Sequence, residues 1–265
     1  LQLWVDNSNI IPAAYPVITP TYNFNFRVAT PLTTTPVITD SVGGLTATYI
    51  NGTTSDTTNG ALFDGINNYI ELDDFEFGGV CSFEVYYKFI TQKNGNVVVQ
   101  FSDTGRTTST ENDLMMLQGG TTNYYNSIRN NGSNTSVWGN GAMGTTNTNW
   151  NHVVWTFNNG THKQYLNGVE KLSTTGVPMR TITRNHHMLG NYFDVVWMHG
   201  YIKYFRVWQG TALTSSDVTQ LYSEREQIIS TEVFNSQATL TATQNKLYLK
   251  YLTLPNAMTI VKDSN

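Results

Sequence analysis

Two runs of alternating polar and apolar residues stand near the middle of the chain, and each ends in an Asn-Gly pair. Residues 149–158 and 161–166 are rich in the β-branched and aromatic side chains that favour strands. The Asn-Gly pairs at 159–160 and 167–168 accept the positive φ angles of type I′ hairpin turns. The pattern predicts an antiparallel β-meander over residues 149–171.

The same period of two appears on both sides of this meander. Residues 23–28 and 83–89 alternate polar and apolar positions, as half-buried strands do. Residues 97–101 form an almost continuous apolar run, which is expected of an inner strand. Around Tyr204 the apolar positions depart from strict alternation, and this departure predicts a β-bulge.

One short helix is predicted near the end of this pattern. Residues 214–217 read Thr-Ser-Ser-Asp, which is similar to a capping box, and apolar residues then follow at 218, 221 and 222. The composition otherwise favours strands, because aromatic residues make up 12% of the chain and charged residues only 13%. A mainly helical protein would expose more Lys and Glu.

Several motifs resemble those of a known family. Residues 60–72 read Gly-Ala-Leu-Phe-Asp-Gly-Ile-Asn-Asn-Tyr-Ile-Glu-Leu, which resembles the A-L-x-F-D-G-x-D-D-Y-V-x-L motif of laminin-G-like domains in the concanavalin A-like lectin/glucanase superfamily. Residues 150–157 and 199–208 resemble further strands of that family, and residues 214–222 resemble its last helix. The resemblance covers about residues 22–225. It implies an antiparallel β-sandwich of the jelly-roll kind with one short C-terminal helix.

The chain divides into three predicted regions. Residues 1–21 carry prolines that remove backbone donors, so they are predicted to form an extended arm, which either lies along its own sandwich or reaches a neighbouring subunit. Residues 22–228 form the predicted sandwich, and residues 229–265 a C-terminal extension with one strand over 246–254. Because the chain begins with Leu1, we expect a processed product or a piece of a longer polypeptide.

Charge and cysteine content disfavour several classes of protein. The net charge is −4 and no Lys/Arg cluster occurs, which argues against a nucleic-acid partner. Cys81 is the single cysteine, so no intrachain disulfide can form, and a small buried residue is the expected role. No apolar run approaches the roughly 18 residues of a membrane span.

Two motifs have the spacing of catalytic or cofactor sites. Residues 71–76 have the E-x-D-x-x-E spacing with which related glucanases carry two catalytic carboxyls. The run directly follows the segment at 63–65, however, which places it at an early strand and turn, and a solvated acidic turn is the favoured interpretation. Residues 139–144 satisfy G-x-G-x-x-G, but loop residues follow where a dinucleotide site needs a helix. No enzymatic activity is predicted.

Aromatic residues in loop-rich regions are the predicted ligand contacts. Such rings can stack on sugar rings or anchor a protein partner, and the alternative is ordinary packing beneath long loops. The predicted ligand-binding residues are Trp138, Tyr124, Tyr125, Tyr192 and Phe193.

Calcium is the one cofactor that the resemblance to this family suggests. Many relatives bind calcium at one rim of the sandwich through Asp, Asn and backbone oxygens. In this chain the candidate ligands from predicted loops are Asp103, Asp113 and Asp194. They lie far apart in the sequence, so a site requires that separate loops converge.

Taken together, these features predict a non-enzymatic structural or recognition module of a virion surface or an extracellular protein. In this interpretation the arms and loops assemble with neighbouring subunits, in part by strand addition. The alternative is a glycan-binding, lectin-like module, with calcium as a possible aid. A β-glucan hydrolase is the third interpretation, and it depends on the acidic run at 71–76.

Overall fold

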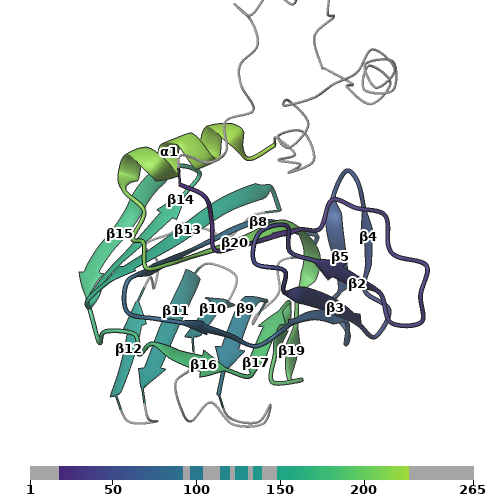
Figure 1. Ribbon diagram of the computed structural model, residues 1–265, viewed down its shortest axis with the longest axis horizontal. Coiled ribbons are helices and arrows are strands. Elements are labelled where there is room, and N and C mark those ends of the chain that lie inside the picture. The colour runs from purple at the N-terminus through teal and green to yellow at the C-terminus, as the bar shows by residue number, and fades with distance from the viewer. Residues whose placement is uncertain are drawn as a thin grey trace, which may run out of the picture. The chain divides into compact units, whose positions relative to one another are not determined.

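The chain folds almost entirely into strands. A computed structural model describes residues 18–91, 96–103, 114–119, 123–130, 134–138 and 148–226 (Figure 1). The strands are β1 (Tyr22–Asn25), β2 (Val37–Thr39), β3 (Thr46–Ile50), β4 (Thr54–Asp56), β5 (Gly60–Asp64), β6 (Tyr69–Leu72), β7 (Phe75–Phe77), β8 (Cys81–Phe89), β9 (Val97–Ser102), β10 (Leu114–Gly119), β11 (Asn123–Asn130), β12 (Asn134–Trp138), β13 (Trp150–Asn158), β14 (Thr161–Leu166), β15 (Val169–Thr175), β16 (Ile182–Arg184), β17 (His186–Leu189), β18 (Asn191–Tyr192), β19 (Val196–Trp197) and β20 (His199–Gln209). The helix α1 (Ser215–Glu224) follows the last strand.

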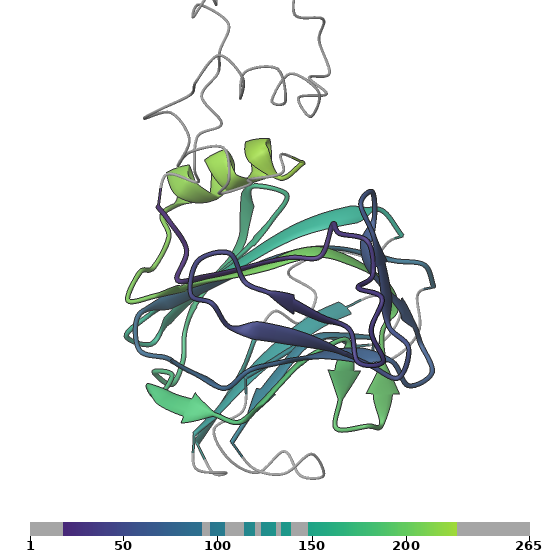
Figure 2. The ribbon, with the colours of Figure 1, turned by 45° about the vertical axis from the view of Figure 1, so that its right-hand side comes forward.

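Two eight-stranded sheets form the body of the fold (Figure 2). Sheet 1 has the order β15-β14-β13-β8-β20-β5-β4, and β1 also pairs with β20. Sheet 2 has the order β12-β11-β10-β9-β17-β6-β3-β2. The pairings in both sheets are antiparallel. The predicted all-β antiparallel sandwich is therefore confirmed.

The described residues belong to one compact unit, Pro16–Glu226. The last residues of the predicted arm lie on its sandwich, because the Trp208 indole donates to the Ile18 carbonyl at 2.7 Å and the Thr21 amide donates to the Val207 carbonyl at 2.7 Å. The predicted extension with its strand lies outside the described residues. The three predicted regions stay a prediction.

The central meander has the predicted turns. Strands β13, β14 and β15 pair in succession in sheet 1. Asn159 and Gly160 have φ angles of 47° and 92°, and Asn167 and Gly168 have 52° and 80°. Positive φ at both central residues is the requirement of a type I′ turn, so the Asn-Gly pairs specify these hairpins locally.

A bulge in β20 occurs where the sequence predicted one. The pairing of β20 with β8 shifts register between Ile202 and Tyr204, so Lys203 is the extra residue. Gly60, at the start of β5, lies against this bulge with a φ of 80°. A Cβ atom on Gly60 would come within 2.3 Å of the Ile202 carbonyl oxygen. The bulge therefore needs a glycine beside it.

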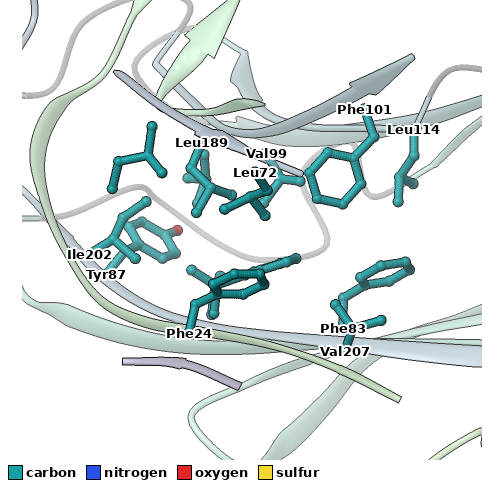
Figure 3. Packing of buried hydrophobic residues seen from close by; sticks show 14 of the residues in the cluster. Phe24, Leu72, Phe83, Tyr87, Val99, Phe101, Leu114, Leu189, Ile202 and Val207 are labelled. Atoms are coloured by element: carbon teal, nitrogen blue, oxygen red, sulfur yellow. The ribbon is translucent and has the colours of Figure 1, made fainter. Parts of the chain in front are cut away.

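The main hydrophobic core lies between the two sheets. Figure 3 shows apolar side chains of both sheets facing one another. Sheet 1 contributes Phe24, Phe83, Tyr87, Ile202 and Val207, and sheet 2 contributes Leu72, Val99, Phe101, Leu114 and Leu189. Full burial of one such side chain is worth about 1.5–3 kcal/mol, so this layer provides the main stabilisation of a fold without a disulfide.

Helix α1 covers part of the outer face of sheet 1. The predicted capping box is present, because the Thr214 side chain accepts from the Asp217 amide and the Asp217 side chain accepts from the Thr214 amide. Val218 and Leu221 are buried in a second cluster that includes Trp208 of β20. The apolar residues whose spacing predicted the helix are therefore the residues that pack it against sheet 1.

Strand β8 is more deeply buried than its alternation predicted. The face with Glu84 and Tyr86 was expected to be half-exposed, but both residues are buried. Helix α1 and long polar side chains of the neighbouring strands cover this outer face of sheet 1. Cys81 is buried as expected, and burial raises the pKa of its thiol to about 12.

His187 makes the stability of the fold depend on pH. Burial lowers the pKa of its imidazole from 6.5 to about 3, although Nδ1 donates to the Asp73 carbonyl at 3.0 Å, and Arg184 and His186 lower it further. The unfolded chain therefore binds this proton near pH 6.5 while the folded chain does not, so stability is present above that pH and declines as pH falls towards 3. We expect His187→Gln to reduce the slope of unfolding free energy between pH 7.5 and 5, measured by urea unfolding. An unchanged slope would contradict this role.

Candidate functional site

Turns from both sheets meet at one end of the sandwich, here called the rim, which comprises residues 64–68, 90–91, 96 and 191–198. His199 connects them, because its backbone pairs with Asp64 and its carbonyl accepts from the Ile90 amide at 2.9 Å. The His199 amide also donates to the Asn96 side chain at 3.3 Å. The hydrogen bonds fix the start of β20 at the rim.

The β18–β19 hairpin is a strained part of the rim. Phe193 and Asp194 have φ angles of 47° and 57°; Asp tolerates this region, whereas a bulky residue such as Phe rarely adopts it. Asn191 holds the turn by donating to the Asp194 carboxylate at 2.7 Å and by accepting from the Asp194 amide at 2.9 Å. Val195 follows with 69% of its surface exposed.

The aromatic residues predicted to bind ligand lie in the β18–β19 hairpin and in two strands of sheet 2. Tyr192 is half-buried in the hairpin, and Phe193 is only 6% exposed, because its ring packs against Tyr192 at 4.7 Å. Tyr124 and Tyr125 lie in β11 and Trp138 in β12, so these three are in strands and not in loops as expected. That these residues bind a ligand stays a prediction.

Two of the predicted calcium ligands, Asp103 and Asp194, lie near opposite ends of β9. Asp103 directly follows the last residue of β9, whereas Asp194 lies in the hairpin that packs on Val97, the first residue of β9. A strand of that length separates the two carboxylates by about 15–20 Å. Asp113 lies outside the described residues. Within the described part of the chain, no three His, Cys, Asp or Glu side chains are grouped as a metal would require.

The acidic run at 71–76 is divided between two sheets. Glu71 lies in β6 of sheet 2, and Glu76 lies in β7, which pairs with β16 outside both large sheets. Asp73 lies between these strands, and its carboxylate accepts from the Thr46 amide at 2.8 Å. The two-carboxylate arrangement on one bulged strand, on which the glucanase interpretation depends, is therefore absent from this run.

An aromatic surface that the sequence did not indicate lies on the outer face of sheet 1, next to the rim. In the strand register, Trp150 of β13 is opposite Lys88 of β8, and Lys88 is opposite Tyr201 of β20. All three side chains are half-exposed, and the two rings are 6.4 Å apart. We call Trp150, Lys88 and Tyr201 the aromatic ledge.

Residues beneath the ledge hold the Trp150 ring in place. The Lys203 ammonium lies 4.3 Å from the centre of the Trp150 ring, and the Tyr86 ring lies 5.0 Å from it. Lys203 and Tyr86 in turn bind the two carboxylate oxygens of Glu226, at 2.7 and 2.6 Å. Lys203 lies two residues after Tyr201 and shares its outer face, and the bulge then brings Tyr204, opposite Tyr86, to the same face.

A buried ionic network lies next to this support. The Glu84 carboxylate accepts from His152 at 2.7 Å, from Arg206 at 3.1 Å and from Tyr204 at 3.2 Å. Burial alone would raise the pKa of the Glu84 carboxyl, but Arg206 and the hydrogen bonds from His152 and Tyr204 lower it below its ordinary value. No surface of Glu84 is exposed, so the network has a structural role and no substrate can reach it.

Sequence reasoning missed the ledge because Trp150 and Tyr201 fall in well-patterned strands and were assigned to the scaffold. One signal was present. Lys88 and Lys203 are charged residues inside strands that are otherwise aromatic and apolar, in a chain with few charges. Their position in the strands indicates a polar outer face.

Comparison with known families identifies the class of the protein. The family model described as the concanavalin A-like lectin/glucanases superfamily, in its laminin G form, matches residues 63–219, which is more than half of the chain. The chain therefore belongs to this superfamily, as its motifs predicted. No curated protein matches the sequence.

Solved structures of the same fold are distant in sequence. Domain 4 of AbnA, a GH43 extracellular arabinanase from Geobacillus stearothermophilus, in complex with arabinotriose, is 18% identical, with a TM-score of 0.54 over 77% of this chain and 98% of that one. The binding domain of botulinum neurotoxin serotype D is 13% identical, with a TM-score of 0.56 over 78% of this chain and 52% of that domain.

A sialidase of Trypanosoma rangeli, solved in complex with sialic acid, shares the fold as well. It is 12% identical, with a TM-score of 0.54 over 78% of this chain. The chain spans only 33% of that protein and about half of the neurotoxin domain. At these identities the likeness shows the fold alone.

Proposed function

We propose that this protein is a non-catalytic glycan-recognition module and that the aromatic ledge contacts the sugar. The single observation that carries the proposal is the row of Trp150, Lys88 and Tyr201 across three neighbouring strands. Two half-exposed rings provide an apolar face for sugar C–H groups, and the half-exposed lysine of the same row offers a donor for sugar hydroxyls. Rigid strands hold these groups, which reduces the entropy cost of binding.

The arabinanase domain supports this proposal. That domain is similar to this chain over nearly its full length, and its structure was solved with arabinotriose bound. A domain of the same fold was therefore solved with a sugar bound, which is consistent with a sugar-binding role for this chain. The division of the acidic run between two sheets agrees with this, since it removes the strand-borne carboxyl pair that the hydrolase interpretation needs.

We expect Trp150→Ala to weaken glycan binding at least about tenfold while the fold is kept, because ring contacts of this kind dominate binding energies. The measurement is a glycan array with the full chain, followed by calorimetric titration with arabinotriose and the strongest array ligands. Tyr201→Ala should weaken binding in the same direction.

Tyr192→Ala is the matched control, since Tyr192 is another half-exposed rim aromatic, in the hairpin and not on the ledge. The variant should bind as the wild type does. If Tyr192→Ala loses binding and Trp150→Ala keeps it, the sugar binds at the hairpin and the assignment of the site to the aromatic ledge is wrong. If the wild type binds no glycan, the proposed function itself is wrong. Adding a chelator tests the calcium-assisted form of the same proposal.

An extracellular setting is the location that we propose, because the similar arabinanase is described as extracellular. Among the described residues no helix is both long and apolar enough to cross a membrane. Assembly with neighbouring subunits through residues 1–21 and 229–265, and a place on a virion surface, stay predictions. Most of those residues lie outside the described part of the chain.

A further inference from the structure

Glu226 lies just after helix α1, and its backbone is fixed to the sandwich. The helix ends at Glu224, and Arg225 is its C-cap. The Arg225 guanidinium donates to the Tyr222 carbonyl at 2.6 Å and lies 4.0 Å from the centre of the Tyr222 ring. The Glu226 carbonyl then accepts from the Arg27 guanidinium at 2.9 Å. The chain is therefore held on both sides of the peptide bond that joins Arg225 to Glu226.

The carboxylate of Glu226 binds two residues that contact the Trp150 ring. Its Oε2 accepts from the Lys203 ammonium at 2.7 Å, and its Oε1 accepts from the Tyr86 hydroxyl at 2.6 Å. The same ammonium lies 4.3 Å from the centre of the Trp150 ring and 5.1 Å from that of Tyr86. Burial raises the pKa of the Glu226 carboxyl, but the hydrogen bonds from Lys203 and Tyr86 lower it below 4.5, so the group is charged at pH 7.

The position of Lys203 depends on this carboxylate. The Lys203 side chain is only 9% exposed, whereas that of Glu226 is 55% exposed. An ammonium with so little access to water is costly without a carboxylate partner, and the flexible lysine stem lets it turn towards solvent. The Trp150 ring would then lose the cation at its face. A ring that samples more orientations loses more entropy when a sugar fixes it, so sugar binding weakens.

We propose that Glu226 is a positioning residue of the aromatic ledge, which acts through Lys203 to orient Trp150 and links sugar binding to the point where the chain leaves the sandwich. The proposal rests on the proposed function, because it concerns the same sugar-binding surface. Glu226 is the last residue of the compact unit, and residues 227–265 follow it. A partner that binds residues 227–265 and withdraws Glu226 from Lys203 therefore lowers the affinity for sugar. By linkage, a bound sugar strengthens the Glu226 contact by the same factor.

Glu226→Gln removes the charge and keeps the size of the side chain. We expect calorimetric titration of the full chain with arabinotriose and the strongest ligands of the glycan array to give dissociation constants about three- to tenfold higher, as expected for one side chain that must be fixed on binding. The thermal midpoint should change little, because an ion pair with an exposed carboxylate contributes little to stability.

Glu170→Gln is the matched control. Glu170 pairs with Lys163 at 3.0 Å in the same sheet, and Lys163 is opposite Thr156 in the strand register, six residues along β13 from Trp150. This variant loses a carboxylate that binds a lysine but does not touch the support of the ledge. It should bind sugar as the wild type does.

A double variant distinguishes positioning from a general structural role. Lys203→Met removes the ammonium and keeps an apolar side chain, and it should weaken sugar binding by a factor similar to that of Glu226→Gln. Because Glu226 acts through Lys203, adding Glu226→Gln to Lys203→Met should change the dissociation constant by at most about twofold. If Glu226→Gln causes the same loss with and without Lys203, it does not act through the lysine, and the positioning role is wrong.

Amide hydrogen exchange of the full chain measures the reciprocal effect. Saturating sugar should slow exchange in the peptide that contains Arg225 and Glu226 in the wild type, and should not do so in Lys203→Met. Equal exchange with and without sugar in the wild type would overturn the link to the chain exit. Unchanged affinity in Glu226→Gln, together with lost binding in Trp150→Ala, would overturn the positioning role and leave the proposed function intact. Absence of all glycan binding in the wild type would overturn both.

Discussion

Glu84→Ala is expected to lower the free energy of unfolding by about 3–5 kcal/mol, the cost of breaking a buried ion pair from one side. The carboxylate is completely buried and accepts hydrogen bonds from His152, Arg206 and Tyr204. Without it, the Arg206 guanidinium, itself only 3% exposed, stays buried with no carboxylate in that network. Urea unfolding at pH 7.5, followed by fluorescence and circular dichroism, gives the measurement.

The matched control removes a carboxylate from an exposed pair. Lys163 and Glu170 are 3.0 Å apart, and each side chain is 36% exposed. Glu170→Ala should cost at most about 1 kcal/mol, because solvent screens such a pair. A loss in Glu84→Ala as small as that of Glu170→Ala would show that the network contributes little and that the helix and core alone hold this face.

Gly60→Ala is expected to destabilise the protein by about 3 kcal/mol or more. The residue has a φ of 80°, which costs an L-amino acid about 1 kcal/mol, and the new Cβ would meet the Ile202 carbonyl oxygen at 2.3 Å and the Lys203 Cα at 2.7 Å. Both contacts are backbone atoms of the bulge, so no side chain can move aside. The bulge must shift, and with it the ammonium that supports Trp150.

Gly210→Ala separates the two parts of this cost. Gly210 has a φ of 81°, but a Cβ there would have no atom within 4 Å. The variant should therefore lose only about 1 kcal/mol in urea unfolding. Glycan binding should weaken in Gly60→Ala and stay unchanged in Gly210→Ala. Equal stability losses in the two variants would mean that the close approach to the bulge is not a constraint.

Features that depend on neighbouring residues were predictable from the sequence. The Asn-Gly turns at 159–160 and 167–168, the capping box at Thr214 and the bulge near Tyr204 all have local causes, namely positive φ, side-chain capping and broken alternation. The family motifs added the sandwich architecture. The turns, the cap and the bulge depend only on residues close together in the sequence, so a single sequence is enough to predict them.

The candidate sites were less predictable. Tyr124, Tyr125 and Trp138 were assigned to loops because the sequence between 102 and 148 is rich in Asn, Gly and Thr, yet these residues lie in β11 and β12. Such polar strands pair through backbone groups and cross-strand neighbours, which composition does not reveal. Asp103 and Asp194 show the same limit, because only the sheet order shows that they lie at opposite ends of β9.

By itself, the sequence determined the strand pattern, the turns, the single helix and the superfamily of this protein. Only the tertiary structure decided which residues on the outer face of sheet 1 are buried and which lie side by side. Whether Glu84 is solvated or buried, and whether Trp150 and Tyr201 stand side by side, depends on β8, β13 and β20 being neighbours, although residues 84 and 206 are far apart in the chain. The physical reason is that alternation fixes the two faces of a strand, whereas packing between distant strands fixes what covers each face.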